Sequence, residues 1–455
     1  MEIGMVEFSV KYAVVGLGHT GVSCAHYLMH KNQSFFIVDS RHNPPGLSEI
    51  ATTYPHILIT TGAIEVSVLI KAQYLIVSPG IPLSTPAIQE AITHGVKLIS
   101  DIDLFFQHVR APVVGITGTN GKSTVTTLVG AMAQQAGINS VVAGNIGVPV
   151  LDVLKTFQKD LYILELSSFQ LERVSHCPLD VAALLNLSPD HLDAHGSFSA
   201  YIKAKQRIFA QCKSAVYWQD DTLTKPVGLP SSQCAAFTSR PPQQEQFGVI
   251  KDSHGYGVAQ DDRVLLYMNE IKLTGRHNLT NIAAALTIGS LLQLPLDIML
   301  EAVRSFSGLA HRCQWVDCIR GVDWFNDSKG TNEASSCSAI AGLASPGSKN
   351  LILIAGGAGK GTDFQQLADN IQRYVRAVIL FGRDADKIAK AIDSRVLVCN
   401  ADNLQEAVEQ ASAVAQPGER VLLSPACTSW DMFADYQERG NAFINHVNQL
   451  KLMYQ

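Results

Sequence analysis

The chain has 455 residues, 47% of them hydrophobic and 16% charged, with a formal net charge of −5 at pH 7. This length suggests about three domains, each large enough to bury a full core. The acidic balance argues against nucleic acid as a main partner, because a phosphate backbone needs a basic surface.

The chain start and the cysteines indicate where the protein works. Residues 1–12 contain no basic segment followed by an apolar run, and no apolar run approaches the ~18 residues of a membrane span. The nine cysteines are scattered without a Cys-x-x-Cys pair, so we expect neither a zinc site nor a disulfide framework. These features predict a reduced, cytoplasmic α/β enzyme.

The first region begins with a strand, a glycine turn and a helix. A strand is predicted at Lys11–Val15 and a helix at Val22–His30, with Gly16–Gly21 spelling G-x-G-x-x-G between them. A second strand, Ser34–Val38, ends at Asp39, 18 residues after the last glycine. This arrangement is typical of a Rossmann dinucleotide site, in which the acid binds a ribose. The same glycines also serve any other ligand that carries a pyrophosphate.

Two further features of the first region lie at strand ends. Arg41 follows the second strand and offers a positive charge to a phosphate or a uracil. The strand Tyr74–Val77 opens into Ser78–Pro82, at the edge where open parallel sheets bind ligands. A plain rigid turn is an equally good interpretation of that Pro/Gly loop.

The second region opens on the stretch around which the chain is organised. A strand at Ala111–Gly115 and a helix at Thr124–Gln135 flank the loop Gly118–Thr124, which reads Gly-Thr-Asn-Gly-Lys-Ser-Thr. This is a variant of the phosphate-binding loop, with backbone N–H groups and a helix N-terminus around one anion site. Lys122 can reach the outer phosphates and Ser123 can bind Mg²⁺. The alternative is a glycine turn followed by a chance lysine.

Three further side chains of this region are candidates. Glu165 ends the buried strand Leu161–Leu164, where a carboxylate can hold Mg²⁺, although a surface acid is the alternative. The predicted helix Tyr201–Phe209 carries Lys205 on the same face as its first residue. From spacing alone, we expect His191 to be a packed or capping histidine and Lys205 to be a solvated helix charge.

Residues 256–270 are predicted to form hairpins, and an Ala-rich helix follows and reaches Leu292. At the start of that helix, Asn278 or Asn281 can contact a purine or a ribose, although Asn278 can equally cap the helix. After the strand Val322–Phe325, the segment Asn326–Asn332 suggests an anion-binding turn, or simply a capped helix start.

The third region alternates strands with helices, which predicts a third parallel α/β sheet. Its further strands are expected at Leu351–Ala355, Ala377–Phe381, Arg395–Cys399 and Arg420–Leu423. The glycine-rich run Gly356–Gly361 lacks the hydroxyl residue that follows a phosphate-loop lysine. We therefore expect Lys360 to bind a substrate carboxylate.

Five motifs in order resemble the Mur ligase family over essentially the full chain. They are GTNGKST at Gly118–Thr124, GNIG at Gly144–Gly147, ELSSFQLE at Glu165–Glu172, NDSKGTN at Asn326–Asn332, and Ser424–Gly440, which begins SPAC and ends ERG. The resemblance implies a three-domain α/β fold. A Rossmann-like UDP-substrate domain would span residues 1–109, a central P-loop ATPase-like parallel-sheet domain with a small β part 110–308, and a Rossmann-like amino-acid domain 309–455.

The resemblance also implies a reaction. The chain looks like the D-glutamate-adding branch of the family, in which ATP phosphorylates the carboxylate of UDP-N-acetylmuramoyl-L-alanine. D-glutamate then attacks the acyl phosphate, and ADP and phosphate are released, in cytoplasmic synthesis of peptidoglycan precursors. ATP and two Mg²⁺ ions are implied, together with a monomer whose third domain closes onto the second to exclude water.

The resemblance assigns residues to four sites. The implied metal ligands are Ser123, Glu165, His191 and a carbamylated Lys205, and the last three are implied in catalysis with Lys122. The implied ATP contacts are Gly118, Thr119, Asn120, Gly121, Lys122, Ser123, Thr124, Asn278, Asn281, Arg312 and Asp327. The implied UDP-substrate contacts are Gly18, Thr20, Ser40, Arg41, Ser78, Pro79, Gly80, Asn145 and Gln170. The implied D-glutamate contacts are Lys329, Thr331, Lys360, Ser429 and Tyr436.

Three residues depart from the family pattern in the amino-acid site. Tyr436 stands where a phenylalanine is expected, Trp430 where a smaller apolar residue is expected, and Gly330 where an alanine is usual. These departures bear on the amino-acid pocket and leave the reaction class unchanged.

Three rival functions remain. An NAD-dependent oxidoreductase would use the first glycine turn and Asp39, but it leaves the phosphate loop unexplained. A P-loop kinase or GTPase-like switch has no use for two further α/β domains. A sibling ligase is the third rival, although the glycine turn at Gly16–Gly21 counts against a folylpolyglutamate synthase, which lacks the N-terminal UDP-binding domain.

Overall fold

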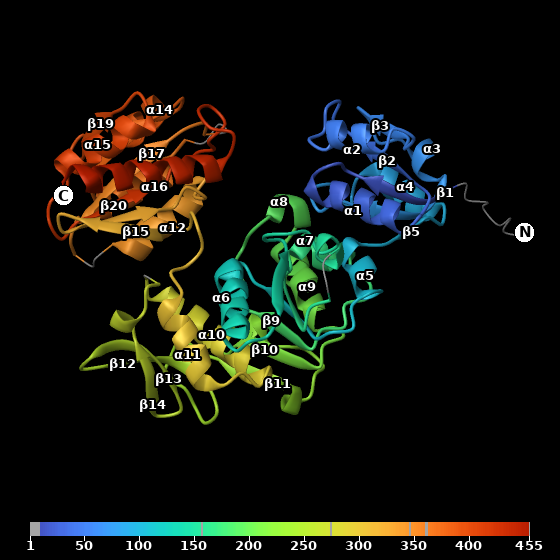
Figure 1. Cartoon of the computed structure of the whole chain (residues 1–455), viewed down its shortest axis with the longest axis horizontal. Coiled ribbons are helices and arrows are strands. Elements are labelled where there is room, and N and C mark those ends of the chain that lie inside the picture. Colours follow the sequence, from blue (N-terminus) through green and yellow to red (C-terminus); the bar gives the residue numbers. More distant parts are fainter. Residues whose placement is uncertain (1–9, 156–157, 274, 345–346, 360–362, 455) are drawn as a thin grey trace, which may run out of the picture. The chain divides into compact units, whose positions relative to one another are not determined.

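The computed structural model describes residues 10–155, 158–273, 275–344, 347–359 and 363–454. It contains three sheets, each with helices packed against it (Figure 1). The chain divides into two compact units, one made of Met1–Ile250, Val258–Leu265 and Thr280–Ala302, and the other of Lys251–Gly257, Leu266–Leu279 and Val303–Gln455. Among the described residues, no helix combines the length and apolar character needed to cross a bilayer.

The first sheet has five parallel strands in the order β3-β2-β1-β4-β5. The strands are β1 (Val10–Val15), β2 (Phe35–Asp39), β3 (Ile59–Thr61), β4 (Ala72–Val77) and β5 (Lys97–Leu98). The helices are α1 (His19–His30), α2 (Leu47–Thr53), α3 (Val66–Leu69) and α4 (Pro86–Thr93). Because β1 pairs with β2 on one side and β4 on the other, its carboxyl end lies where strand order reverses. Open α/β sheets bind ligands at this point, so the predicted Rossmann-like sheet is confirmed.

The second sheet has nine strands in the order β14-β13-β12-β11-β10-β9-β6-β8-β7. Its strands are β6 (Val113–Thr117), β7 (Ser140–Gly144), β8 (Leu161–Glu165), β9 (Val181–Leu184), β10 (Ser214–Trp218), β11 (Cys234–Phe237), β12 (Phe247–Asp252), β13 (Gly255–Gln260) and β14 (Arg263–Tyr267). The strand β6 is fully buried and pairs in parallel with β8 and β9. Three strand ends therefore meet beside the phosphate loop. The predicted hairpin near residue 260 is confirmed as β13–β14.

Helices and short 3-10 turns accompany this sheet. The helices are α5 (Asp101–Phe106), α6 (Lys122–Gln135), α7 (Ser168–Arg173), α8 (Leu192–His195), α9 (Phe198–Gln206), α10 (His277–Leu291) and α11 (Leu296–Ser305). The 3-10 turns are η1 (Asp152–Lys155), η2 (Arg207–Phe209), η3 (Thr222–Thr224), η4 (Ser231–Gln233) and η5 (Met268–Glu270).

The third sheet has six strands in the order β15-β16-β20-β17-β18-β19. The strands are β15 (Gln314–Ile319), β16 (Val322–Asn326), β17 (Leu351–Gly356), β18 (Val375–Phe381), β19 (Leu397–Asn400) and β20 (Arg420–Leu423). The predicted strands pair in parallel, which confirms the predicted sheet. One further strand, β15, was not predicted, and it pairs antiparallel with β16 at the edge. Arg320 and Gly321 connect these two strands with φ of +52° and +77°. A two-residue turn with both φ values positive is the geometry that joins antiparallel strands.

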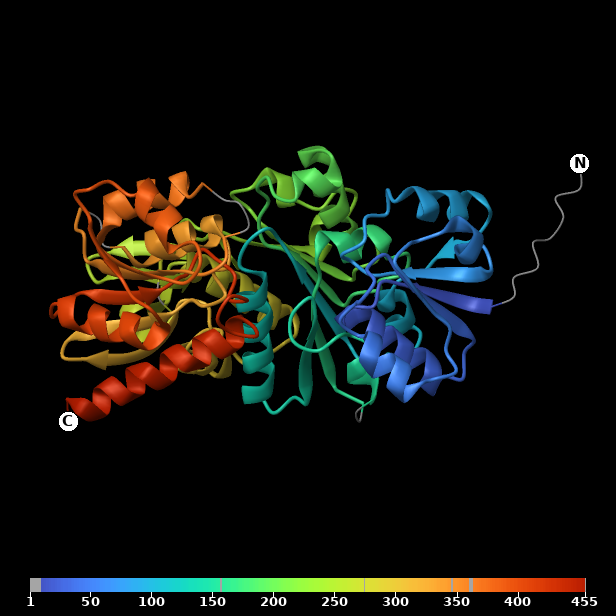
Figure 2. The ribbon, with the colours of Figure 1, turned by 90° about the horizontal axis from the view of Figure 1, so that it is seen from above.

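Helices cover both faces of the third sheet. They are α12 (Glu333–Leu343), α13 (Gln365–Tyr374), α14 (Ala385–Ala391), α15 (Leu404–Val414) and α16 (Tyr436–Met453). Side chains of β17 alternate between two apolar cores: Leu351 and Leu353 pack with α12 to α14, whereas Ile352 and Ile354 pack with α15 and α16. Figure 2 shows α16, in red, as one unbroken helix that ends the chain.

Candidate functional site

The phosphate loop lies between β6 and α6. Gly118 and Gly121 have φ of +156° and +79°, so both need the freedom of glycine. A Cβ on Gly121 would lie 2.4 Å from Oδ1 of Asn281, so this side chain of α10 lies against the loop. The helix α6 begins at Lys122, two residues before the predicted start, and its N-terminal N–H groups therefore face the loop.

The loop is fastened to the end of β9 and closed by its own lysine. Asn186 accepts from the N–H groups of Thr119 and Asn120, at 2.9 Å and 2.8 Å. The ammonium of Lys122 donates to the carbonyls of Gly118 and Thr119, at 3.0 Å and 2.9 Å. Lys122 therefore lies over the point on which the loop amides converge.

Glu165 ends β8 beside this loop. Its side chain is 2% exposed, so the alternative of a surface acid is wrong. Oε1 accepts from the amide of Asn145 at 2.7 Å, whereas Oε2 is buried and has no hydrogen-bond partner among the described residues. Buried carboxylate oxygens are normally paired or bound to a metal ion. The orphaned oxygen of Glu165 therefore fits a cation.

Lys205 lies beneath the loop. As expected, Tyr201 and Lys205 lie on one buried face of α9, but the expectation of a solvated charge is wrong, because Lys205 is only 2% exposed. Its ammonium donates to Oγ1 of Thr117 at 3.2 Å and to the carbonyl of Gly118 at 2.9 Å, and lies 4.9 Å from the centre of the Tyr201 ring. Burial, together with the nearby charge of Lys122, lowers the pKa of Lys205 to about 7.

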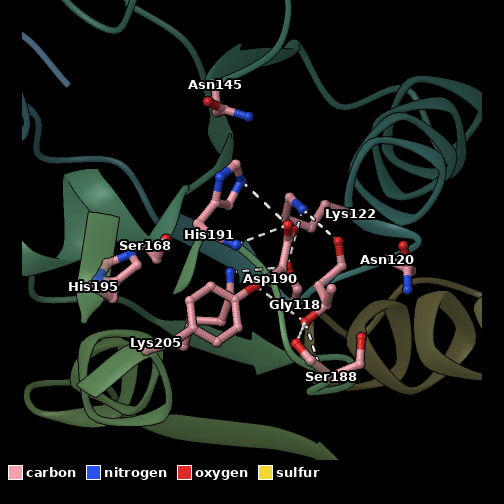
Figure 3. A network of polar contacts seen from close by, with 12 residues as sticks. Gly118, Asn120, Lys122, Asn145, Ser168, Ser188, Asp190, His191, His195 and Lys205 are labelled. Carbon is pink, nitrogen blue, oxygen red and sulfur yellow. Dashed lines mark hydrogen bonds and ion pairs between the residues drawn. The ribbon is translucent and has the colours of Figure 1, made fainter. Parts of the chain in front are cut away.

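His191 projects from the segment that follows β9 (Figure 3). Its backbone is left-handed, with φ of +51°, and its carbonyl accepts from the N–H groups of Ala194 and His195. Its imidazole is 52% exposed, lies 3.6 Å from the carboxylate of Asp190 and contacts the ring of Phe169 edge-on, with centroids 5.2 Å apart. The backbone of His191 therefore begins α8, while its ring stays accessible to a ligand.

Metal ligands of mixed type are consistent with the rest of the site. Among the described residues, no three His, Cys, Asp or Glu side chains gather as a metal cluster. The predicted set differs from such a cluster, because it adds a hydroxyl, Ser123, and a lysine to one carboxylate and one imidazole. Ser123 lies in the first turn of α6 and is 4% exposed.

The glycine turn after β1 is held from below by Asp39. This carboxylate is 1% exposed and accepts from the N–H of Leu17 at 2.7 Å and from the guanidinium of Arg41 at 2.7 Å and 2.9 Å. Burial alone would raise the pKa of Asp39, but the hydrogen bonds from Arg41 and Leu17 outweigh it and lower the pKa below its usual value. The sequence suggested Asp39 as a ribose ligand and Arg41 as a phosphate or uracil contact. The structure pairs them with each other.

The loop after β4 lies against the same turn. The hydroxyl of Ser78 donates to the carbonyl of Gly16 at 3.0 Å. A Cβ on Gly16 would lie 2.9 Å from this side chain, and a Cβ on Gly21 would lie 1.9 Å from the carbonyl oxygen of Gly16. The structure thus brings Ser78 next to the turn that contains Gly18, which directly precedes α1. Thr20 follows in the first turn of α1, Ser40 follows β2, and Pro79 and Gly80 follow Ser78.

The remaining predicted residue of this substrate site, Gln170, is 5% exposed in α7. Its amide oxygen accepts from the N–H and the hydroxyl of Ser167, each at 3.0 Å, and completes a capping box. Gln170 therefore fixes the start of α7.

In the third sheet, the segment after β16 is both a capped helix start and a polar cluster. Asn332 caps α12 by accepting from the N–H of Ser335 at 2.9 Å. Asp327 is buried and accepts from Ser424 at 2.6 Å and from the N–H of Cys313 at 3.1 Å. Burial raises the pKa of Asp327 to about 6. Arg312 directly precedes Cys313. The cluster therefore contains one predicted nucleotide contact, Asp327, and lies next to another, Arg312.

A fully buried guanidinium joins three segments of this sheet. Arg439 in α16 donates to the carbonyl and hydroxyl of Ser328 and to the carbonyl of Cys427, at 2.9 to 3.2 Å. Ser328 in turn donates to the carbonyl of Tyr436 at 2.8 Å. The ammonium of Lys329 lies 5.2 Å from the centre of the Tyr436 ring.

The predicted D-glutamate residues lie on or beside these segments. Lys329 and Thr331 follow Ser328, Ser429 follows Cys427 by two residues and is 2% exposed, and Tyr436 begins α16. Lys360 lies outside the described residues. Asn278 lies in the first turn of α10, because this helix begins at His277.

Comparisons with known proteins decide the family. The Mur ligase MurD-like N-terminal domain matches residues 10–100, the Mur ligase middle domain residues 116–289, and the Mur ligase glutamate ligase domain residues 311–427. The chain belongs to the Mur ligase family. The predicted family and fold class are therefore confirmed.

Relatives of this Mur ligase align with nearly its whole length. UDP-N-acetylmuramoylalanine--D-glutamate ligase of Pseudomonas fluorescens (strain Pf0-1) is 45% identical over 96% of this chain and 97% of its own. The protein of the same name from Saccharophagus degradans is 46% identical over the same shares.

Solved Mur ligases share the fold. The UDP-N-acetylmuramate-alanine ligase MurC from Thermotoga maritima aligns with a TM-score of 0.59 at 16% identity, over 97% of this chain and all of its own. MurF ligase from Thermotoga maritima, solved in complex with ADP, aligns with a TM-score of 0.53 at 15% identity, over 98% of this chain and 96% of its own. At these identities the likeness concerns the fold alone.

Two residues of this Mur ligase lie in the site although the sequence did not nominate them. The hydroxyl of Tyr201 lies 3.1 Å from Oγ1 of Thr119 in the phosphate loop. Nε2 of His195 lies 3.0 Å from the hydroxyl of Ser168. Burial lowers the pKa of His195, whereas burial raises the pKa of Tyr201 to about 12. For Tyr201 the available signal was its i, i+4 spacing to Lys205, because such pairs share a helix face.

Proposed function

We propose that this Mur ligase joins D-glutamate to UDP-N-acetylmuramoyl-L-alanine at the cost of ATP, in cytoplasmic synthesis of peptidoglycan precursors. Relatives at 43–46% identity over nearly the whole chain carry the corresponding name. The observation that carries the proposal is the meeting of Lys122, the loop amides and the orphaned oxygen of Glu165 at the ends of β6 and β8.

The proposed reaction has two steps. The substrate carboxylate attacks the γ-phosphorus of ATP, the bond to the β-phosphate oxygen breaks, and ADP leaves an acyl phosphate behind. The amine of D-glutamate then attacks the acyl carbon, loses a proton and expels phosphate as the amide forms. In the first step Lys122 and the loop amides neutralise negative charge that spreads over the transferred group, which is the dominant requirement of phosphoryl transfer.

We further propose that Ser123 and Glu165 hold one Mg²⁺ and that His191 and Lys205 serve a second. Bound there, the two ions would neutralise phosphate charge and orient its oxygens. The buried, unpartnered oxygen of Glu165 fits such an ion. Lys205 fits only after carbamylation, because an ammonium repels Mg²⁺ whereas a carbamate offers anionic oxygens. Its pKa of about 7 favours this modification, since the neutral amine is the form that attacks CO₂ and then releases a proton.

The three sheets would divide the substrates. We propose UDP-substrate binding by residues 1–109, ATP binding by 110–308 and amino-acid binding by 309–455. The UDP contacts would be Gly18, Thr20, Ser40, Arg41, Ser78, Pro79, Gly80, Asn145 and Gln170. The D-glutamate contacts would be Lys329, Thr331, Lys360, Ser429 and Tyr436, with Asn278, Asn281, Arg312 and Asp327 completing the ATP site.

Phosphate release from ATP tests the proposal. With UDP-N-acetylmuramoyl-L-alanine present, we expect release only when D-glutamate is added from a panel of amino acids. Release with meso-diaminopimelate in place of D-glutamate would reassign the chain to a sibling ligase. A fluorescence titration with NADH is the control for the oxidoreductase alternative, and we expect no binding.

A further inference from the structure

The single helical turn α8 carries a histidine at each end. His191 begins it, since its carbonyl accepts from the N–H groups of Ala194 at 3.1 Å and of His195 at 3.0 Å. Gly196 follows with φ of +74°, the left-handed conformation that ends a helix. One turn is not stable in water by itself. The orientation of α8, and with it the direction of the His191 imidazole, therefore depends on contacts to neighbouring elements.

One aromatic ring contacts both histidines. His195 stacks on Phe169 with centroids 5.0 Å apart and planes 13° apart, while His191 meets the same ring edge-on at 5.2 Å. Both imidazoles reach this ring, His191 from just before the turn and His195 from its last residue. Phe169 belongs to α7, which directly follows the strand that ends in Glu165. The ring therefore ties α8 to the segment that carries the catalytic carboxylate.

His195 makes two further contacts, one with a hydroxyl and one with a second aromatic ring. Its Nε2 lies 3.0 Å from the hydroxyl of Ser168, the first residue of α7. Its ring meets Tyr201 edge-on at 5.4 Å, and the hydroxyl of Tyr201 lies 3.1 Å from Oγ1 of Thr119 in the phosphate loop. Figure 3 shows His195 beside Ser168, on one side of the group that surrounds Lys122. His195 thus connects α8 with α7 and α9 at once.

His191, by contrast, combines an exposed imidazole with a left-handed backbone. Its ring is 52% exposed and lies 3.6 Å from the carboxylate of Asp190. A left-handed backbone costs a residue with a side chain about 1–2 kcal/mol. Such a conformation persists only where the surrounding structure imposes it. The N–H of His191 donates to the carboxylate of Asp190 at 3.0 Å, and the contacts of His195 with Phe169 and Ser168 fix the other end of the turn.

We propose that His195 is a positioning residue for the ligase reaction: its stack on Phe169 and its hydrogen bond to Ser168 hold α8 so that His191 presents its imidazole to a divalent cation. The inference rests on the proposed role of His191 in binding the second Mg²⁺. Partners that orient a metal-binding histidine typically change metal affinity 10- to 100-fold when they are removed.

Binding of Mn²⁺, followed by electron paramagnetic resonance, tests this role without turnover. The full chain would be titrated with Mn²⁺ in bicarbonate buffer in the presence of β,γ-methylene-ATP. We expect His191→Ala to abolish the weaker class of bound Mn²⁺ and His195→Ala to weaken it about tenfold, with the tighter class unchanged. His195→Gln retains a nitrogen that can bond Ser168 but loses the stack on Phe169, so we expect it to recover about threefold of the loss. The matched control His94→Ala removes a histidine at the end of α4 and should bind as the parent does.

Kinetics separate positioning from a general structural defect. With His195→Ala, the Mg²⁺ concentration for half-maximal ligation should rise about tenfold, while the rate at saturating Mg²⁺ returns to near the parental value. Should His195→Ala fail to fold, by circular dichroism, Ser168→Ala removes only the hydrogen-bond partner and carries the same expectation at about threefold.

The outcomes distinguish the two proposals. If His191→Ala weakens Mn²⁺ binding and His195→Ala does not, the positioning role is overturned while the proposed function stands. If His191→Ala leaves both classes of Mn²⁺ intact, the metal assignment of His191 falls and the positioning role falls with it. A loss of ligation by His195→Ala that high Mg²⁺ does not restore would also count against positioning.

Discussion

The glycine turn after β1 and the glycine loop after β6 share a backbone plan. Each follows a buried parallel strand at a point where strand order reverses, and each leads into a helix. They differ in the charged group beneath. Asp39 lies under the first and binds the N–H of Leu17, whereas Lys205 lies under the second and binds the carbonyl of Gly118.

Because the charged group beneath the backbone differs, the spacing of the glycines alone does not predict which ligand or reaction a loop supports. In the first turn the buried carboxylate of Asp39 is neutralised within the chain by Arg41. At the second loop lie two ammonium groups, those of Lys122 and Lys205, and the half-paired carboxylate of Glu165. The loop after β6 is therefore suited to reaction and the turn after β1 to recognition.

The strongest test of this contrast removes Lys122, the lysine that belongs to the second loop itself. Lys122→Ala should lower ligation about 10²- to 10³-fold, because charge spreading over the transferred phosphoryl group loses its positive partner. Phosphate release measures the loss, and circular dichroism should show an unchanged fold. Parental turnover by this variant would invalidate the proposed ATP site.

The next largest effect should come from a substitution that displaces the backbone of the first turn and so lowers the stability of the fold. Gly21→Ala places a Cβ 1.9 Å from the carbonyl oxygen of Gly16, so the turn must shift, at a cost of about 2–3 kcal/mol in the free energy of unfolding. The matched change Gly18→Ala meets no atom within 4 Å and has φ of −92°, so it should cost under about 0.5 kcal/mol. Urea denaturation compares the two, and equal stabilities would contradict the close packing of this turn.

A third test concerns the charge beneath the second loop. The folded pKa of Lys205, about 7, lies below its unfolded value, so the unfolded state binds more protons between these values and stability rises with pH there. Lys205→Met removes this titration. Its stability relative to the parent should be greatest at about pH 6 and should fall on the order of 2 kcal/mol by about pH 9.

Denaturation in CO₂-free buffer measures this difference, because carbamylation would otherwise supply a different charge. A stability difference that stays constant with pH would mean that Lys205 titrates normally.

The smallest effect is expected beneath the first turn. Asp39→Asn weakens the bonds to Leu17 and Arg41 and should cost about 1 kcal/mol at neutral pH, since Arg41 is half exposed. The pKa of Asp39 is depressed, so the parent holds this stability above the usual carboxyl range and loses it as pH falls through the folded pKa. The gap between parent and variant should therefore close in acid, as thermal melts at several pH values would reveal.

The sequence predicted the parallel sheets and the loops at their carboxyl ends, because buried strands read as apolar runs and glycines mark the turns. It could not place Lys205 correctly. A lysine on a polar helix face normally lies in solvent, and its burial follows from the docking of α9 against the end of β6, 88 residues away along the chain.

Two other features were not predicted from the sequence, for similar reasons. The strand β15 lies at an exposed sheet edge, so its sequence shows only a weak apolar pattern. The Arg320–Gly321 turn was the remaining indication that this strand pairs antiparallel with the next one. His195 acquires its role from Ser168 and Tyr201, which belong to other helices. Sequence patterns report local periodicity, whereas these properties arise from contacts between elements.

The buried guanidinium of Arg439 has a consequence for the proposed D-glutamate site. Burial lowers its pKa only to about 10, so it keeps its charge at neutral pH and binds Ser328 and Cys427, which precede Lys329 and Ser429. Ser328 in turn donates to the carbonyl of Tyr436. Substitutions at those three positions should therefore be energetically coupled rather than independent. Altered selectivity would have to arise by concerted replacement, with single changes passing through poorly active intermediates.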